Sequence, residues 1–299
     1  PPADTRPMTG ERHSPRHHPW RSGRGATAMA LRPLEITDWL QPGPDFRSQM
    51  KQREQLLENN HSDVTYCPAD TRAAGQEVLD WLIDQITRHH PDSYAFSDRL
   101  AVCAATGRQI RLDQDDPLIT AARLVQEDLC LLRAGAEGYA LAAAVVCFPS
   151  RWSLAEKAGK PLRAIHGPVP DYEAELARPV DRFFDMLKPE RPVWRANWSL
   201  HQDPELYQPG DYFRTGITAA PDIPDGLWIR VERQCLQRLT SGDVLFTIRT
   251  FIDPLNSISD DRPSRREMAT ALAAFPDEML DYKNMRPWRD DVVRWLDAP

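Results

Sequence analysis

Apolar residues at helical spacing mark two helices in the first third of the chain. Residues 44–60 are mostly polar and rich in helix-forming side chains, and residues 74–90 form a longer run that Pro91 closes. In that run the apolar side chains recur three and four positions apart, at Val78, Leu79, Leu82, Ile83 and Ile86. This spacing places them on one side of an α-helix, so we expect a helix that buries one face.

The middle of the chain combines helical and strand-like patterns. Residues 116–135 predict a further amphipathic helix, and Gly135 and Gly138 predict the turn that leads into the apolar run 139–150. Residues 154–172 are rich in Pro and Gly, and residues 173–188 predict another helix. Such a long irregular connection indicates either a binding loop or a wrong assignment.

The later half of the chain alternates apolar and polar residues with a period of two. Three runs follow this pattern, at 191–202, 225–240 and 244–255, and the last two read as a hairpin around the turn Ser-Gly-Asp. Helical patterns return in residues 264–275 and 288–297. We therefore expect an α+β fold in which helices flank an antiparallel sheet.

Composition limits the classes of partner. The chain has 299 residues and a formal net charge of −7, which disfavours binding to nucleic acid. Its five cysteines form no CxxC pair, so we expect free thiols in a reducing, cytoplasmic compartment. No apolar run approaches the roughly 18 to 20 residues of a membrane helix, so no membrane partner is expected.

The first 28 residues differ from the rest. They are rich in Pro, Arg, Gly and His and have neither an apolar segment nor a helical period. We expect residues 1–28 to be a disordered leader and residues 29–299 to be a single domain with helical additions at both ends.

Polar side chains share faces of the predicted strands. Arg195, Asn197, Ser199 and His201 alternate with the apolar side chains Trp194, Ala196, Trp198 and Leu200. Likewise, Trp228, Arg230, Glu232 and Gln234 lie opposite Leu227, Ile229, Val231 and Arg233, while Arg249 shares a face with Leu245 and Phe251. Solvent, cross-strand ion pairs or a bound carboxylate would each explain such a pattern, and the spacing does not choose among them.

The loop around His166 carries the other candidate chemistry. Pro168 and Pro170 restrict the backbone near this histidine, and a fixed position is what a metal ligand requires. A lone histidine is more often a structural residue, however. The sequence contains no HExxH, Walker A, GxGxxG or GxSxG motif, so zinc hydrolase, nucleotide-binding and serine hydrolase sites are not indicated.

A series of motifs resembles a known family. In chain order these are SDRLAV, LVQEDLCLL, CFPSRWSLAEKAGKPLRAIHGPVPDY, RANWSLH, LWIRVERQCLQRL and VLFTIRTFIDPL, within residues 95–260. Together they resemble the haem-dependent oxidative N-demethylase α-subunit-like family. The resemblance implies a PAS-like fold, an antiparallel sheet covered by helices, that holds a b-type haem iron.

The implied activity is that of a haem-dependent monooxygenase. Such an enzyme activates O2 and removes a methyl group from a small secondary amine such as dimethylamine, which releases formaldehyde. Electrons would come from NAD(P)H through a separate reductase partner, because this chain carries no dinucleotide, flavin or iron–sulfur motif.

The resemblance also assigns roles to residues. His166 is the first choice for the ligand of the haem iron and His201 the second. The expected contacts of the haem propionates and ring come from the following residues: Arg195, Arg230, Arg233, Arg249, Trp198 and Phe148. Glu232 is the catalytic candidate, which would hold or deprotonate the substrate amine.

Two other classes remain open on the sequence. One is a PAS-like sensor that binds haem or a small ligand without turnover, since the chain has no motif through which electrons would enter. The other is a structural or assembly protein that keeps the scaffold and has lost haem.

Overall fold

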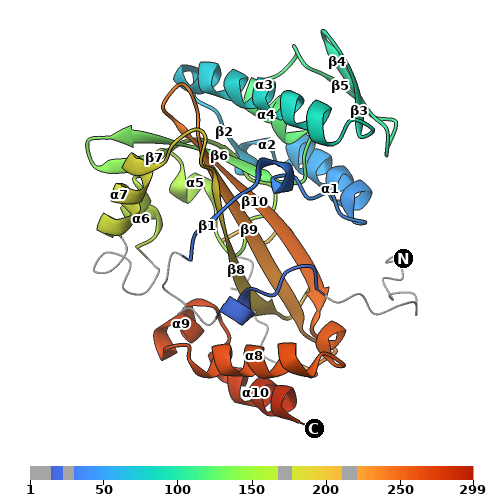
Figure 1. The fold of residues 1–299 in the computed structure, drawn as a ribbon, viewed down its shortest axis with the longest axis vertical. Coiled ribbons are helices and arrows are strands. Elements are labelled where there is room, and N and C mark those ends of the chain that lie inside the picture. Colours follow the sequence, from blue (N-terminus) through green and yellow to red (C-terminus); the bar gives the residue numbers. More distant parts are fainter. Residues whose placement is uncertain (1–14, 23–29, 168–176, 211–220, 299) are drawn as a thin grey trace.

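A seven-stranded antiparallel sheet forms the centre of the protein. The computed structural model describes residues 15–22, 30–167, 177–210 and 221–298. The strands lie in the order β1 (Arg32–Pro33), β8 (Val193–His201), β9 (Trp228–Arg238), β10 (Val244–Pro254), β6 (Asp128–Gly135), β7 (Gly138–Val145) and β2 (Thr65–Tyr66). An antiparallel sheet flanked by helices agrees with the predicted α+β class (Figure 1).

The long strands β8, β9 and β10 carry the alternating runs of the sequence. β9 and β10 form the predicted hairpin, with pairs from Arg238 and Val244 at the turn to Trp228 and Pro254 at the far end. Nine residues of β8 pair with β9 on its other side. Because side chains alternate across a strand, this register fixes which polar residues share a face.

The predicted helix over residues 116–135 is wrong in its second half. Only α4 (Pro117–Ala122) is helical, and β6 begins at Asp128. The run from Leu129 to Leu132 is buried on both faces of a central strand, between β10 and β7. A continuous apolar run fits a buried strand as well as a helix, and pairing with two neighbours decided for the strand.

Helices cover both faces of the sheet. One face is covered by α1 (Phe46–Asn59), α2 (His61–Val64), α3 (Arg72–His89) and α4. The other face is covered by α5 (Leu154–Lys157), α6 (Leu162–Ile165) and α7 (Ala177–Met186). The far end of β8, β9 and β10 is covered by α8 (Arg262–Ala273), α9 (Asp277–Tyr282) and α10 (Arg289–Asp297) (Figure 1). The sequence predicted α1, α3, α7, α8 and α10, although residues 173–176 of the α7 prediction lie outside the described residues.

The two faces of the sheet pack against different helices. The α3 face carries Leu129, Leu131, Cys235 and Leu245, which pack in one core with α1, α3 and α4. The α6 face carries Cys130, Leu132 and Leu236, which pack with α5, α6 and α7. A third cluster extends the α3 face toward α8 and α10, with Leu200, Ile229 and Val231 from the strands.

A second, three-stranded sheet was not predicted. It consists of β3 (Tyr94–Ser97), β4 (Leu100–Cys103) and β5 (Gln109–Arg111), joined by tight turns beyond the end of α3. Strands of three or four residues are too short for a period to stand out in the sequence.

Part of the expected leader belongs to the folded domain. Residues 15–22 lie along the domain and include the short 3-10 helix η1 (Pro19–Ser22). Trp20 is 3% exposed, contacts the ring of Trp198, and donates a hydrogen bond from Nε1 to Ser264 Oγ at 3.0 Å. The expectation of disorder therefore fails for these eight residues, because one tryptophan gives an otherwise polar segment an apolar anchor.

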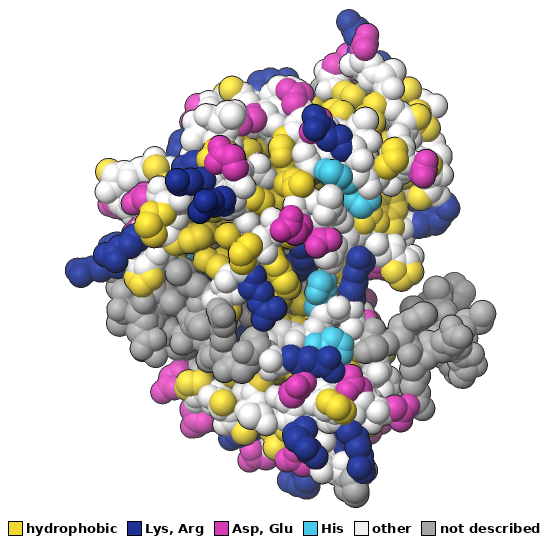
Figure 2. Space-filling model, viewed as in Figure 1, with side chains coloured by type: hydrophobic (Ala, Val, Ile, Leu, Met, Phe, Trp, Pro, Cys, Tyr) yellow, Lys and Arg dark blue, Asp and Glu magenta, His cyan; other side chains and the backbone are white. Residues whose placement is uncertain are grey.

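The surface shows no segregation of charge on the face drawn in Figure 2, where acidic and basic side chains of the described residues are interspersed. Within the same described residues, every helix is too short or too polar to cross a membrane.

Candidate functional site

The register of β8 and β9 gathers the predicted polar side chains on the α6 face. Asn197 lies opposite Glu232, Ser199 opposite Arg230, and Arg195 opposite Gln234. These side chains lie on the side of the sheet that α5 and α6 cover. The alternation seen in the sequence therefore describes a real cluster, which we call the α6-face cluster: Arg195, Asn197, Ser199, His201, Arg230, Glu232 and Gln234.

His166 stands at the end of α6 with its ring orientation fixed. Its Nδ1 lies 2.9 Å from the carbonyl oxygen of Leu162. A carbonyl oxygen only accepts hydrogen bonds, so Nδ1 carries the proton and Nε2 keeps its lone pair. Burial lowers the pKa of His166 to about 4, and the positive charges of Lys157 and Arg195 act in the same direction. The ring is therefore neutral at pH 7, as a metal ligand must be.

His201 is placed differently. It is fully buried at the end of β8, and its Nε2 lies 2.7 Å from Ser199 Oγ. Burial lowers the pKa of His201 well below its usual value, and the charges of Arg151 and Arg230 add to that effect. Its Nδ1 is buried without a hydrogen-bond partner among the described residues, so His201 also keeps a nitrogen that could ligate iron.

Arg230 anchors the loops around the cluster. Its guanidinium donates to the carbonyl oxygens of Phe148 at 2.7 Å and of Glu205 and Leu206 at 3.3 Å each. Its Nε lies 3.5 Å from Glu232 Oε1. These contacts occupy a fully buried side chain, so Arg230 has a structural role in the described chain.

Arg195 has spare hydrogen-bonding capacity. Its guanidinium forms no hydrogen bond or ion pair within the described residues, and its Nε is buried without a partner. Burial lowers the pKa of Arg195, and the nearby carboxylate of Glu232 opposes this shift. An arginine remains protonated in proteins, so a half-buried one without a partner suits an anionic ligand.

Glu232 lies among cations. Its side chain is 13% exposed, and its charge raises the pKa values of Lys157, Arg195 and Lys283 against the effect of burial. Lys283 follows α9 and is buried; its Nζ donates to Asn197 Oδ1 at 3.0 Å and to the carbonyl oxygen of Trp198 at 2.8 Å. Burial lowers the pKa of Lys283 to about 8.

The sequence did not identify Lys157 or Lys283 as site residues. Lys157 lies within the motif CFPSRWSLAEKAGKPLRAIHGPVPDY, to which no role was assigned at this position. Lys283 lies about fifty positions after Glu232 in a helical region, and no pattern in the sequence connects it to the sheet. Only the packing of the C-terminal helices brings its ammonium group to β8.

The remaining predicted residues lie on the α3 face. Arg233 donates to the carbonyl oxygens of Asp38 at 2.7 Å and Trp39 at 2.9 Å. Arg249 donates to Gln49 Oε1 at 2.8 Å and Asp45 Oδ1 at 3.1 Å. One cofactor on the α6 face cannot reach these two arginines, because the sheet lies between them.

The two aromatic residues expected beside the haem pack elsewhere. The ring of Trp198 contacts Trp20 and Phe275 in the cluster near α8. The ring of Phe148 lies under the guanidinium of Arg53 at 4.8 Å, in the core with α1 and α3. Pro168 and Pro170, which were expected to hold His166, lie outside the described residues.

The donor set on the α6 face fits a haem. A haem iron takes four ligands from its porphyrin and needs one imidazole from the protein, which His166 would supply. Arg195 and Lys157 would meet the propionates. Within the described part of the chain, no group of three or more His, Cys, Asp or Glu side chains is arranged to hold a metal ion. Iron held mainly by a porphyrin requires no such group.

Residues 30–293 match the family described as haem-dependent oxidative N-demethylase, alpha subunit-like. The match includes every strand of the central sheet and extends beyond residues 95–260, where the motifs first indicated it. It also includes His166, Arg195, Glu232 and Lys283. The chain belongs to the haem-dependent oxidative N-demethylase, alpha subunit-like, family.

Proposed function

We propose that the protein binds haem b on the α6 face, with His166 as the iron ligand, and acts as the haem component of an oxidative N-demethylase for a small secondary amine. The observation that carries this proposal is the state of His166. Its Nδ1 proton is held by the Leu162 carbonyl, its ring is neutral, and Arg195 and Lys157 are close enough to lower its pKa. Family membership supplies the kind of cofactor.

The place of His166 in the fold supports a PAS-like haem domain. The helical connection between β7 and β8 contains α5, α6 and α7 and lies over one face of the antiparallel sheet. His166 is part of this connection, as expected for a PAS-like domain that takes its haem ligand from the helices before the later strands.

Each side chain of the cluster would have a separate task. The bound haem would supply the iron at which O2 is activated for oxidation of the amine's methyl group. Arg195, with Lys157, would bind the propionates by charge-assisted hydrogen bonds. Glu232 would take the proton that a secondary ammonium ion must lose before oxidation, so that its carboxylate becomes a carboxylic acid as the amine becomes neutral.

Electrons would enter from outside the chain. Oxidation of the amine with O2 consumes two electrons, and we assign their supply to NAD(P)H through a separate reductase. The sequence contains no dinucleotide-binding or iron–sulfur motif that would receive them directly.

The test is the absorption spectrum of protein produced with added haem precursor, recorded oxidised and then reduced under CO. A Soret band that shifts on reduction and CO binding supports a haem with an open position. No Soret band would reject the cofactor and favour a structural or assembly role. His166→Ala should abolish haem retention, and the exposed His61→Ala is the matched control. An unchanged spectrum in His166→Ala would move the ligand to His201 or elsewhere.

A second candidate function is a haem-binding sensor without turnover. The cations around Glu232 favour it, since they compete with an ammonium substrate for that carboxylate. Consumption of O2 that depends on dimethylamine, measured with a reductase and NADPH, would exclude the sensor. A haem protein that binds CO but shows no such consumption would support it.

A further inference from the structure

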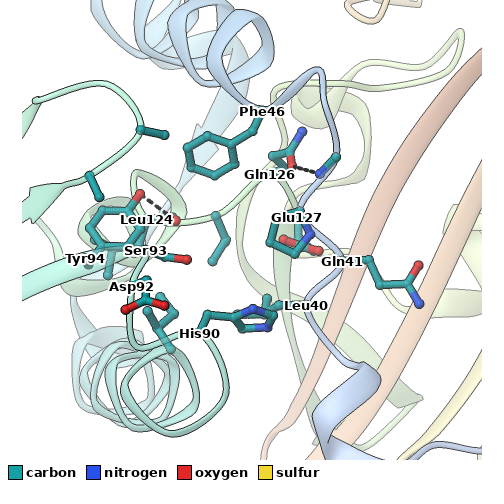
Figure 3. Close-up of a pocket in the computed structure, with 16 residues that line it drawn as sticks. Leu40, Gln41, Phe46, His90, Asp92, Ser93, Tyr94, Leu124, Gln126 and Glu127 are labelled. Carbon is teal, nitrogen blue, oxygen red and sulfur yellow. Dashed lines mark hydrogen bonds between the residues drawn. The ribbon is translucent and has the colours of Figure 1, made fainter.

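A cavity of about 490 Å³ lies on the α3 side of the molecule, away from His166. Its walls come from the loop before α1, the end of α3, the turns of the small sheet and the segment between α4 and β6 (Figure 3). This volume is within the range of about 300 to 1,000 Å³ found for small-molecule sites. None of the proposed haem contacts lines it.

Most of the polar groups in its wall are already bonded. Tyr94 donates its hydroxyl to the carbonyl oxygen of Leu124 at 2.9 Å. Gln126 donates to Gln49 Oε1 at 2.7 Å and accepts from the backbone N–H of Gly43 at 3.2 Å. These side chains have therefore used their donors within the protein.

Two carboxylates in the wall have unused acceptor capacity. Glu127 is 3% exposed, lines the cavity, and its Oε1 has no hydrogen-bond donor among the described residues. Asp92, on the turn after α3, lies across the cavity from it (Figure 3) and forms no hydrogen bond or ion pair within the described chain. An unsatisfied buried acceptor is costly, so such an acceptor in a cavity wall indicates a ligand with donors.

Nearby arginines do not supply the missing donor. Arg53, Arg233 and Arg249 stabilise the charge of Glu127 at longer range, while burial raises the pKa of its carboxyl group. The hydrogen bonds that they form go to other partners, such as Asp128 for Arg53 and Asp45 for Arg249, while Nε of each arginine and Nη1 of Arg53 are buried without a partner among the described residues. The carboxyl group of Glu127 thus has compensating charge near it but no hydrogen bond to Oε1.

We propose that this cavity binds a small organic ammonium ion with an apolar body. The N–H groups of the ligand would donate to the carboxylate of Glu127, and Asp92 would add a second negative charge. The apolar body would pack against the rings of Phe46 and Tyr94 and the side chain of Ile86. Aromatic rings also attract cations, so the same walls tolerate the head group.

The probe pair is 4-phenylbutylammonium and 4-phenylbutanoate, which share a body and differ in the sign of their charge. In isothermal titration calorimetry at pH 7, the full chain should bind the cation. It should bind the anion at least tenfold more weakly. Glu127→Gln should lower the affinity for the cation about tenfold or more. The exposed Glu137→Gln, with the same change in formal charge, should leave that affinity unchanged. Equal binding of both probes, or full affinity in Glu127→Gln, would overturn the proposal.

Two further variants keep the test decisive. Ala105→Phe places a ring at the exposed rim of the cavity and leaves Glu127 in place. It should therefore prevent binding of the cation without lowering the melting temperature of the protein. It replaces Glu127→Gln if that variant fails to fold. His166→Ala should bind the cation like the parent chain. Loss of binding in His166→Ala would place the ammonium ion on the α6 face and reject the cavity as its site.

Discussion

The two faces of the central sheet hold arginines from β8, β9 and β10 that differ in their hydrogen bonding. On the α3 face, Arg233 and Arg249 direct their terminal N–H groups at carbonyl oxygens, an amide and a carboxylate of the chain itself. On the α6 face, Arg195 has no hydrogen-bond partner in the described residues. Arg230, also on the α6 face, donates to three carbonyl oxygens of the chain.

This difference separates structural arginines from candidates for ligand binding. Four buried or half-buried arginines in one sheet look equivalent in the sequence, and each could meet a propionate. Among the described residues, Arg195 is the one of these four whose guanidinium forms no hydrogen bond, whereas Arg233 and Arg249 leave only Nε without a partner. A role in binding should therefore be tested as a contrast between Arg195 and the arginines that already bond other parts of the chain.

The largest loss of stability should come from the charged network around Asp128, at the start of β6. Asp128 accepts from Arg53 at 2.9 Å and from the backbone N–H groups of Cys147 and Phe148. In Asp128→Ala, a buried guanidinium and two backbone N–H groups lose their acceptor. We therefore expect a loss of about 3–5 kcal/mol in the free energy of unfolding. Urea denaturation measures it, with the exposed Asp98→Ala as control. A loss below about 1 kcal/mol would show that the network is not structural.

Arg233→Met should have the next largest effect. The carbonyl groups of Asp38 and Trp39 would lose their donors, and we expect a loss of about 2–3 kcal/mol in the free energy of unfolding. Haem affinity should stay as in the parent, because Arg233 lies on the opposite face from His166. The exposed Arg266→Met is the matched control for urea denaturation. A stable variant with weakened haem binding would reverse the assignment of the two faces.

Arg195→Met should give the opposite result. With no hydrogen bond to lose, the free energy of unfolding should change by less than about 0.5 kcal/mol. The affinity for hemin should fall about tenfold, or about 1.4 kcal/mol, because a propionate loses a charged partner. Titration of hemin into the apoprotein, followed in the Soret region, measures this, and Arg191→Met is the exposed control. Unchanged hemin affinity would remove Arg195 from the site.

The smallest expected effect concerns pH and the N-terminal segment on the α3 face. His17 packs against Phe251 and bonds Gln41, and burial lowers its pKa to about 4. The unfolded chain takes up this proton first, near pH 6.5, so stability falls as the pH drops from about 6.5 toward 4. His17→Gln should reduce that fall by about 1 kcal/mol between pH 7.5 and about 5.8. Urea denaturation at both pH values measures the free energy of unfolding of the parent, of His17→Gln and of the control His61→Gln. An identical fall in stability in the parent and in His17→Gln would contradict the prediction.

Much of the fold followed from residue patterns. The period of two in β8, β9 and β10 gave the hairpin and assigned the polar residues to faces, because a strand directs alternate side chains to opposite sides. The helical spacing around Val78 and Leu82 likewise gave α3. The run from Leu129 to Leu132 was misassigned because uniform burial removes the period on which such an assignment depends.

The sequence by itself determined the residue types of the site, the motifs that identify the family, and the division of its arginines between two faces. Only the tertiary structure decided which of those arginines are already bonded, since their partners at Asp38, Asp45, Phe148 and Leu206 come from loops far away in the chain. It also brought Lys283 to Asn197 and left Glu127 Oε1, in a cavity wall, without a donor among the described residues. Hydrogen bonds and burial depend on distance in space, and a linear pattern records only neighbours along the chain.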